Sequence, residues 1–215
     1  APKYDTQIKE ASKDLLKRSI GWMTRIKPLI LESGRIILPI YSDGLNFSLT
    51  AISDDNGGTW RTGLPIVGRG SIQPALAQRK NGNIVALMRD SGDAPGRVLQ
   101  SISTDQGESW SATVKTEIPN SASVELLKLN DGKWAFLGND IDDGRYRMRI
   151  YLSDDEGETW KWKVDIENSE ERNDRFSYPS LSQDAQGLLH MTYSYQIGKS
   201  EAIKYVVVDP QRITD

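Results

Sequence analysis

The chain has 215 residues, of which 37% are hydrophobic and 27% are charged, and its formal net charge is -3. This is the composition of an ordinary globular protein, and scattered basic residues without a net positive charge exclude an electrostatic surface for nucleic acid. The absence of cysteine excludes disulfides and thiolate metal sites, and no apolar stretch approaches the ~18 residues that a membrane-spanning helix needs.

The first segment of the chain, residues 5–19, is predicted to be helical. Asp5 can serve as its N-cap and Gly21 as its stop signal. We therefore expect residues 1–21 to form a helical excursion ahead of the main domain, residues 22–215.

An apolar run, a turn glycine and a second apolar run then recur along the chain. In the first copy these are residues 28–31, Gly34 and residues 36–40. The turns contain Ser-Gly, Asn-Gly or Asp-Gly pairs in three copies, and such pairs favour tight hairpins between antiparallel strands. The turn glycines of the four copies are Gly34, Gly82, Gly132 and Gly187.

Three octets follow the pattern Ser-x-Asp-x-Gly-x-Thr/Ser-Trp, and their first residues, Ser53, Ser103 and Ser153, are 50 residues apart. The aspartate can accept backbone hydrogen bonds in a tight turn, the glycine can adopt a positive φ, and the tryptophan offers a large apolar area to bury. We interpret these octets, termed Asp boxes, as structural turns rather than catalytic or calcium-binding sites, and we expect no metal and no cofactor. Their structural residues are Asp55, Asp105, Asp155, Trp60, Trp110 and Trp160.

Each hairpin followed by an Asp box predicts four antiparallel strands in about 50 residues, which is the size of a propeller blade. The predicted fold is therefore all-β, a β-propeller with four blades in this chain. Four blades are too few to close the ring. We accordingly expect further blades, either in a longer chain or supplied by another one.

Polar residues recur at the end of each predicted blade that lies opposite the Asp boxes. Propeller blades surround a central channel, so this end is the natural position for a pocket; the alternative is that strand ends are polar whatever their function. Counting from the turn glycines gives the strand starts Arg25, Gln73, Ser123 and Tyr178, the strand ends Tyr41, Arg89, Asn139 and Ser194, and the adjoining residues Asp43 and Tyr195.

With the Asp boxes and these positions, residues 22–208 resemble the sialidase superfamily of six-bladed propellers, of which they would be blades three to six. The resemblance implies that Tyr178 stands at the nucleophilic tyrosine and that Arg89 and Arg145 stand at two of the three arginines that bind the substrate carboxylate; Arg147 is a close rival of Arg145. Their tips and that of Gln73 should then lie within about 10 Å of one another. Further expected substrate contacts are Arg25, Asp43, Asn139 and Tyr195.

The sequence departs from the family pattern at Gln73, where the family has the glutamate that activates the tyrosine. A carboxylate can take the phenol proton, whereas a neutral amide cannot. The resemblance implies a sialidase-like glycoside hydrolase acting on an acidic sugar. Two alternatives stay open: a polysaccharide lyase or other glycosidase, with Tyr178 acting as an acid or base beside the arginines, and a non-catalytic propeller that binds glycan or protein.

The remaining expectations concern partners and location. We expect a carbohydrate substrate and no nucleic acid. The sequence does not fix the compartment, since no signal peptide is visible at its start; a secreted or periplasmic location is favoured.

Overall fold

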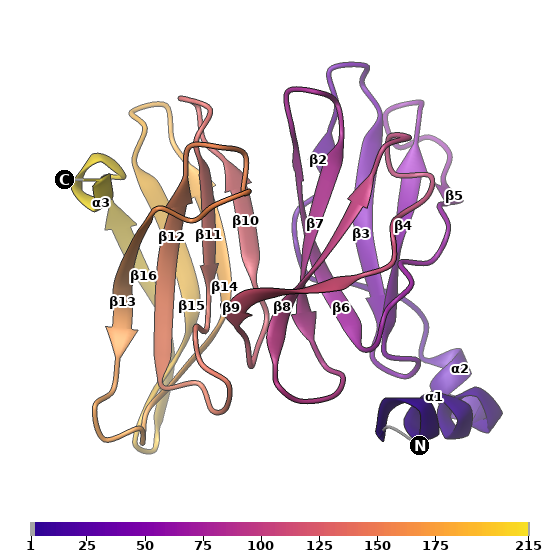
Figure 1. Ribbon diagram of the computed structural model, residues 1–215, viewed down its shortest axis with the longest axis horizontal. Helices are drawn as coiled ribbons and strands as arrows, with labels where there is room; N and C mark the ends of the chain where they lie inside the picture. Colours follow the sequence, from indigo (N-terminus) through magenta and orange to yellow (C-terminus); the bar gives the residue numbers. More distant parts are fainter. Residues whose placement is uncertain (1–2, 215) are drawn as a thin grey trace. The chain divides into compact units, whose positions relative to one another are not determined.

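A computed structural model describes residues 3–214 of the chain. Apart from three short helices, its regular structure consists of antiparallel strands (Figure 1). The chain divides between Glu117 and Ile118 into two compact units. Each unit contains two β-sheets. No helix among the described residues is long and apolar enough to cross a membrane.

The first unit opens with two helices instead of the single expected one. The first helix begins at Lys3, so Asp5 lies in its first turn and is not the N-cap; Asp14 caps the second helix, because its side chain accepts hydrogen bonds from two backbone N–H groups of that helix. The elements of the first sheet and the helices are α1 (Lys3–Lys13), α2 (Leu15–Ser19), β1 (Met23–Thr24), β2 (Leu29–Ile30), β3 (Ile36–Ser42), β4 (Phe47–Ser53) and β5 (Arg61–Thr62).

Both sheets of the first unit follow the expected order of a blade. In the first sheet β1 and β2 pair one after the other with the same strand, β3, so the first strand of this blade is interrupted. The strands β4 and β5 follow in chain order. The second sheet runs in chain order and its last strand extends across the division between the units. Its strands are β6 (Ser71–Gln78), β7 (Ile84–Asp90), β8 (Arg97–Ser103) and β9 (Val114–Pro119).

The second unit contains a four-stranded sheet and a three-stranded sheet, both in chain order. The three-stranded sheet comes from the copy of the repeat that lacks an Asp box. The elements are β10 (Glu125–Lys128), β11 (Trp134–Gly138), β12 (Arg147–Ser153), β13 (Trp162–Asn168), β14 (Arg175–Gln183), β15 (Leu189–Ile197), β16 (Ser200–Val208) and α3 (Gln211–Thr214).

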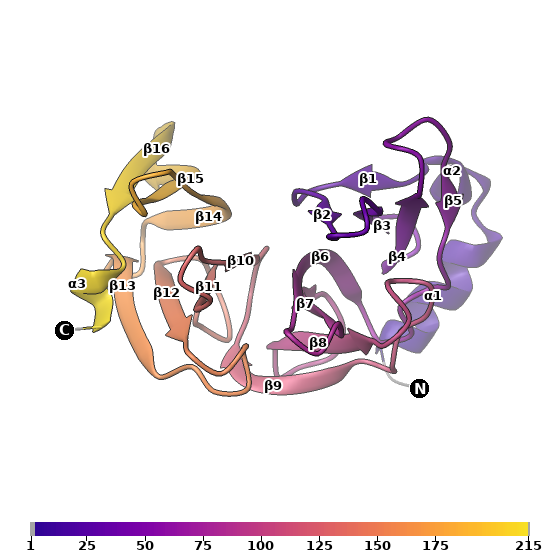
Figure 2. The ribbon, with the colours of Figure 1, turned by 90° about the horizontal axis from the view of Figure 1, so that it is seen from above.

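In each unit a core of apolar side chains joins the two sheets, which lie side by side when seen from above (Figure 2). In the first unit, Ile37 of β3 packs with Ile84 and Met88 of β7. In the second unit, Leu137 of β11 packs with Met191 of β15. Burial of these alternate side chains stabilises the blades at about 25 cal/mol for each Å² of apolar area.

The turn glycines adopt the left-handed conformation that the hairpins require. Gly34, Gly82, Gly132 and Gly187 have φ values of 86°, 89°, 88° and 88°. The prediction of an all-β propeller with four blades in this chain is confirmed. The end of a sheet that carries these turns and the Asp boxes is called the Asp-box end below, and the other is called the opposite end.

Candidate functional site

The Asp boxes are closed hydrogen-bonded turns. In the first box, the Thr59 N–H donates to Asp55 Oδ1 at 2.8 Å and the Thr59 hydroxyl to Oδ2 at 2.7 Å, while the Ser53 hydroxyl donates to Oδ1 at 2.9 Å. Because these hydrogen bonds favour the ionised carboxylate, they hold the pKa of Asp55 below its usual range. The same contacts recur at Asp105 and Asp155.

The three tryptophans of the boxes differ in how far they are buried. Trp110 packs against the core of the first unit, and Trp160 lies 5.6 Å from Phe136, centroid to centroid. Trp60 remains 46% exposed, although its Nε1 donates to Gly57 O at 3.0 Å. The expected burial of the anchor is therefore wrong for Trp60.

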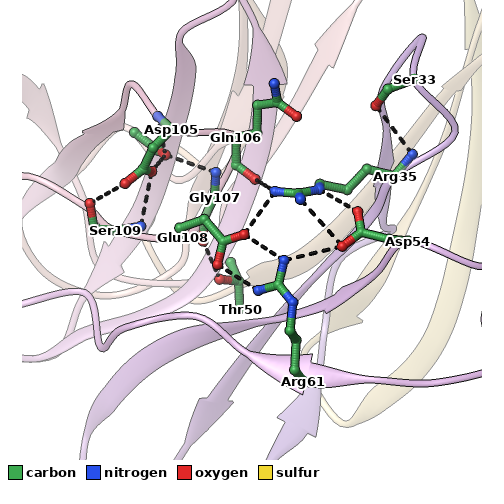
Figure 3. A network of polar contacts seen from close by, with 11 residues as sticks. Ser33, Arg35, Thr50, Asp54, Arg61, Asp105, Gln106, Gly107, Glu108 and Ser109 are labelled. Carbon is green, nitrogen blue, oxygen red and sulfur yellow. Dashed lines mark hydrogen bonds and ion pairs between the residues drawn. The ribbon is translucent and has the colours of Figure 1, made fainter.

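The Asp-box end of the first unit also carries a network in which arginines and carboxylates neutralise one another (Figure 3). Arg35 contacts Asp54 at 2.6 Å and Glu108 at 3.0 Å. Arg61 contacts the same two carboxylates at 3.1 and 2.5 Å. The network joins the first sheet to the second Asp box. Both guanidinium groups have carboxylate partners.

At the opposite end, two sheets share a backbone irregularity at equivalent positions. The register of β6 against β7 shifts between Ile72 and Ala75, and Gln73 has a φ of 58°. The register of β14 against β15 shifts between Ser177 and Ser180, and Tyr178 has a φ of 55°. A positive φ is unusual for residues other than glycine, and such strain gathers at functional sites. These bulges re-aim the two side chains.

Gln73 is buried, with 4% of its surface exposed. Its Nε2 donates to the Tyr41 hydroxyl at 3.3 Å, and its Oε1 has no hydrogen-bond partner among the described residues. An unpaired buried amide oxygen is costly. Gln73 therefore combines a strained backbone conformation with a buried hydrogen-bond acceptor that has no donor among the described residues.

The opposite end of the second unit holds a hollow of about 550 Å³ that includes Tyr178, Arg145 and Tyr195. Arg145 Nη2 lies 3.4 Å from the Tyr178 hydroxyl, and its Cζ lies 4.9 Å from the centre of that ring. Arg145 Nη1 donates to the Ser177 hydroxyl at 3.2 Å. Tyr178 is 37% exposed, so its ring is open to solvent. Three residues expected at the site thus meet within one unit.

Arg145 and its sequence rival Arg147 have different surroundings. Arg147 donates to the backbone oxygen of Asp140 and lies 3.7 Å from the carboxylate of that residue. Arg145 has no carboxylate partner within residues 3–214, and the same holds for Arg175, which lines the same hollow. The hollow therefore carries two guanidinium groups that no contacting carboxylate neutralises.

Other expected site residues lie elsewhere. Asn139 is 1% exposed, and its Nδ2 donates to the backbone oxygens of Arg147 at 2.6 Å and Phe176 at 2.9 Å, which gives it a role between two sheets. Arg25 follows β1 and is half-buried. Asp43 and Arg89 line a separate hollow of the first unit.

The prediction that Gln73 and Arg89 come within about 10 Å of Tyr178 and Arg145 stays a prediction, because it concerns residues of both units.

The lining of the second unit's hollow includes polar residues that were not singled out from the sequence, among them Arg175, Ser177 and Glu201. Arg175 and Ser177 lie on β14 just before its bulge. Glu201 lies on β16 opposite Gln196 of β15, and the tight turn at Gly198 connects these two strands. The glycine at position 198 is the one local signal from which that hairpin could have been predicted. The described residues contain no group of His, Asp or Glu side chains suited to a metal ion.

The only histidine, His190, contacts Asp184 of the Gly187 turn at 2.7 Å and Tyr205 at 2.5 Å. It therefore lies at the Asp-box end, away from the hollow of Tyr178. The hydrogen bond from His190 lowers the pKa of Asp184.

Comparison with known proteins agrees with this architecture. The sequence profile of the BNR repeat-like domain matches residues 11–191, so the chain belongs to that family. Its blades have the sialidase-like propeller fold. A comparison with curated protein sequences finds no match.

Several solved structures are similar in fold. An intramolecular trans-sialidase from Ruminococcus gnavus, in complex with oseltamivir carboxylate, shares 20% identity at a TM-score of 0.68, over 85% of this chain and 42% of that one. A protein of unknown function from Dyadobacter fermentans shares 16% identity at a TM-score of 0.70, over 86% of this chain and 53% of that one. A sialidase from Streptococcus pneumoniae shares 20% identity at a TM-score of 0.69, over 86% of this chain and 30% of that one. The chain thus spans about half or less of each of these three structures.

Proposed function

We propose that the protein is a glycoside hydrolase that cleaves a glycosidic bond next to an acidic sugar, with the hollow around Tyr178 as part of its active site. The observation that carries the proposal is the pair formed by Arg145 and Tyr178 at 3.4 Å. The guanidinium has only neutral partners, and the phenol is exposed on a strained bulge.

Arg145 is suited to bind the carboxylate of the sugar. A guanidinium group matches a carboxylate with two parallel hydrogen bonds. Internal ion pairs would compete with such a ligand, as they do for Arg147, but Arg145 has none within the described part of the chain. Support also comes from the solved relatives, several of which are sialidases, one of them bound to a carboxylate-bearing ligand.

Tyr178 is suited to act as the nucleophile that attacks the sugar. Its oxygen would attack the anomeric carbon, the bond to the leaving group would break, and water would later release the sugar from the tyrosine. The attack requires a base to take the phenol proton. Gln73 cannot act as that base, whereas Glu201 supplies a carboxylate to the lining of the same hollow.

The neutral amide at Gln73 favours a second candidate, a lyase that acts on uronic acids. In that reaction Tyr178 as phenolate would remove the proton next to the sugar carboxylate, and the glycosidic oxygen would leave with formation of a double bond. Arg145 supports it in the same way, because a positive charge beside a phenol favours the ionised form.

The test is turnover of a sialoside, a uronic-acid glycoside and a neutral glycoside by the protein and two tyrosine variants. We expect Tyr178→Phe to lower kcat/KM on an acidic substrate about 100-fold or more, because it removes the oxygen that acts in general acid–base or nucleophilic catalysis. Tyr205→Phe removes an exposed phenol at the Asp-box end and should leave turnover unchanged.

The products distinguish the candidates. A hydrolase releases a saturated acidic sugar, and a lyase releases an unsaturated one whose double bond is conjugated to the carboxylate and absorbs ultraviolet light. Turnover by Tyr178→Phe equal to that of the unaltered protein would overturn both. Binding of acidic sugars without turnover of any substrate would instead assign a non-catalytic role to the hollow.

A further inference from the structure

The N-terminal helices form one wall of a second hollow, at the opposite end of the first unit. Its volume is about 390 Å³. The other walls come from the turn after β3 and from the ends of β6 and β7. The charged residues of its lining are Lys3, Lys17, Asp43 and Arg89.

The helices α1 and α2 lie at the opposite end of the first unit's sheets (Figure 1), and several contacts attach them there. Tyr4 of α1 is 8% exposed, and its hydroxyl donates to Asn46 O at 3.3 Å. Asp5 pairs with Arg69 at 2.5 Å. A Cβ placed on Gly44 would come within 2.4 Å of the Lys17 backbone oxygen, so the turn after β3 and α2 are in direct contact. These contacts place the backbones of Lys3 and Lys17 beside the hollow, and their exposed side chains contribute to its lining.

The charges of this hollow are not balanced by internal partners. Three cationic side chains face one carboxylate, Asp43. Within residues 3–214, neither Lys3, Lys17 nor Arg89 forms an ion pair or a side-chain hydrogen bond, and the buried Nε of Arg89 has no acceptor. Donors that lack acceptors in a concave site predict an anionic ligand.

We propose that the helix-walled hollow binds an anionic group of an acidic oligosaccharide, a carboxylate or a sulfate, with Lys3 and Lys17 as specificity-determining residues and Arg89 as the group behind them. The choice of a saccharide rests on the function proposed above, whereas the preference for an anion rests on the charges of the hollow alone. Asp43, Gln7 and Ser91 add acceptors and donors suited to sugar hydroxyl groups. The hollow thus selects glycans by their charge.

The experiment measures binding by isothermal titration calorimetry in the Tyr178→Phe background, in which we expect turnover to be slower by about 100-fold or more. The probes are a uronic-acid tetrasaccharide, a neutral tetrasaccharide and inorganic sulfate. The variants are Lys3→Ala with Lys17→Ala, combined in one chain. The matched control is Lys9→Ala, which removes a lysine of α1 that does not line the hollow.

We expect the double variant to bind the acidic tetrasaccharide about tenfold more weakly, because each exposed charge contributes roughly threefold. Added salt should weaken the unaltered protein more than the double variant, since salt screens exposed charges. Lys9→Ala and the neutral probe should show no such change.

Equal affinity of the double variant and the Lys9→Ala control for the acidic probe would overturn the proposal. Binding of sulfate as tight as that of the tetrasaccharide would overturn the saccharide assignment. The function proposed for Tyr178 fails by a different result, unchanged turnover of Tyr178→Phe, so the two failures are distinguishable.

Discussion

The two ends of the sheets use similar side chains in opposite ways. At the Asp-box end, Arg35 and Arg61 are both paired with Asp54 and Glu108, and each box aspartate has hydrogen bonds from its own turn. At the opposite end, Arg145 and Arg89 lie in hollows without carboxylate partners among the described residues, whereas Arg147 and Arg69 are paired with Asp140 and Asp5. Two polar side chains of this end, Gln73 and Tyr178, stand on left-handed backbone.

The difference separates structure from function. A group whose hydrogen bonds and charges are satisfied within the chain contributes to stability and has nothing left for a ligand. A group that is left unsatisfied costs stability and persists where it serves another purpose. Loss of a residue at the Asp-box end should therefore lower stability, and loss of Arg145 or Tyr178 should lower function.

The largest expected effect is on stability, at Trp110. Trp110→Ala should lower the free energy of unfolding by about 3 kcal/mol, since the ring packs against the core of the first unit. Trp60→Ala should cost roughly 1 kcal/mol, because that ring is half exposed. Urea denaturation measures both. Equal losses for the two variants would show that the packing of Trp110 is not what stabilises the second box.

The next effect contrasts the two ends of one strand, β6. Gln73→Glu places a carboxylate where the side chain is 4% exposed, and should destabilise the protein by about 2 kcal/mol at pH 7. Burial raises the pKa of such a carboxyl, so the loss should shrink as the pH falls toward 5. Gln78→Glu, at the Asp-box end of β6, removes the hydrogen bond that Gln78 Nε2 donates to Gly82 O at 3.1 Å, but this exposed contact should cost about 1 kcal/mol or less.

The same variant tests the resemblance at Gln73. Activity on a sialoside that appears or rises in Gln73→Glu would support a sialidase-like reaction. Loss of turnover of a uronic-acid substrate in Gln73→Glu would support the lyase.

A smaller effect separates the two neighbouring arginines. Arg147→Ala should lower the free energy of unfolding by about 1 kcal/mol, because it removes a partner of Asp140, which is 5% exposed. Arg145→Ala should leave stability within about 0.5 kcal/mol of the unaltered protein. Thermal unfolding of the two variants decides, and a larger loss in Arg145→Ala would assign that residue to the structure.

The smallest effect is the pH dependence of the Asp-box end. The hydrogen bond from Arg61 holds the pKa of Glu108 below its usual range, and Arg35 does the same for Asp54. A lowered folded-state pKa contributes stability above the unfolded value, 4.5 for Glu and 3.8 for Asp, and that stability is lost as the pH falls further. Urea midpoints should therefore drop below pH 4.5, and less steeply in Glu108→Gln. Parallel curves for both proteins would contradict this account.

The sequence predicted the blades well because their signals are local. An Asp box closes through residues within four positions of Asp55, and a turn glycine acts through its own φ. Counting from Gly187 placed Tyr178 at the opposite end, where Arg145 lies beside it, and the roles of both residues stay predictions.

Other features depend on contacts between distant segments. The bulges at Gln73 and Tyr178 arise from the pairing register of whole strands. The burial of Asn139 between two sheets depends on Phe176, which is 37 residues away, and its role as a substrate contact stays a prediction. The exposure of Trp60 likewise depends on what covers the first sheet, which no octet encodes.

The central claim is that unsatisfied arginines bind ligand while satisfied ones hold the fold, and one paired measurement tests it directly. Affinity for an acidic sugar and the free energy of unfolding are measured for Arg145→Ala and Arg35→Ala. We predict that Arg145→Ala loses affinity about tenfold or more at unchanged stability, and that Arg35→Ala loses stability at unchanged affinity. The reverse pattern, with Arg145→Ala unstable and binding normally, would contradict the claim.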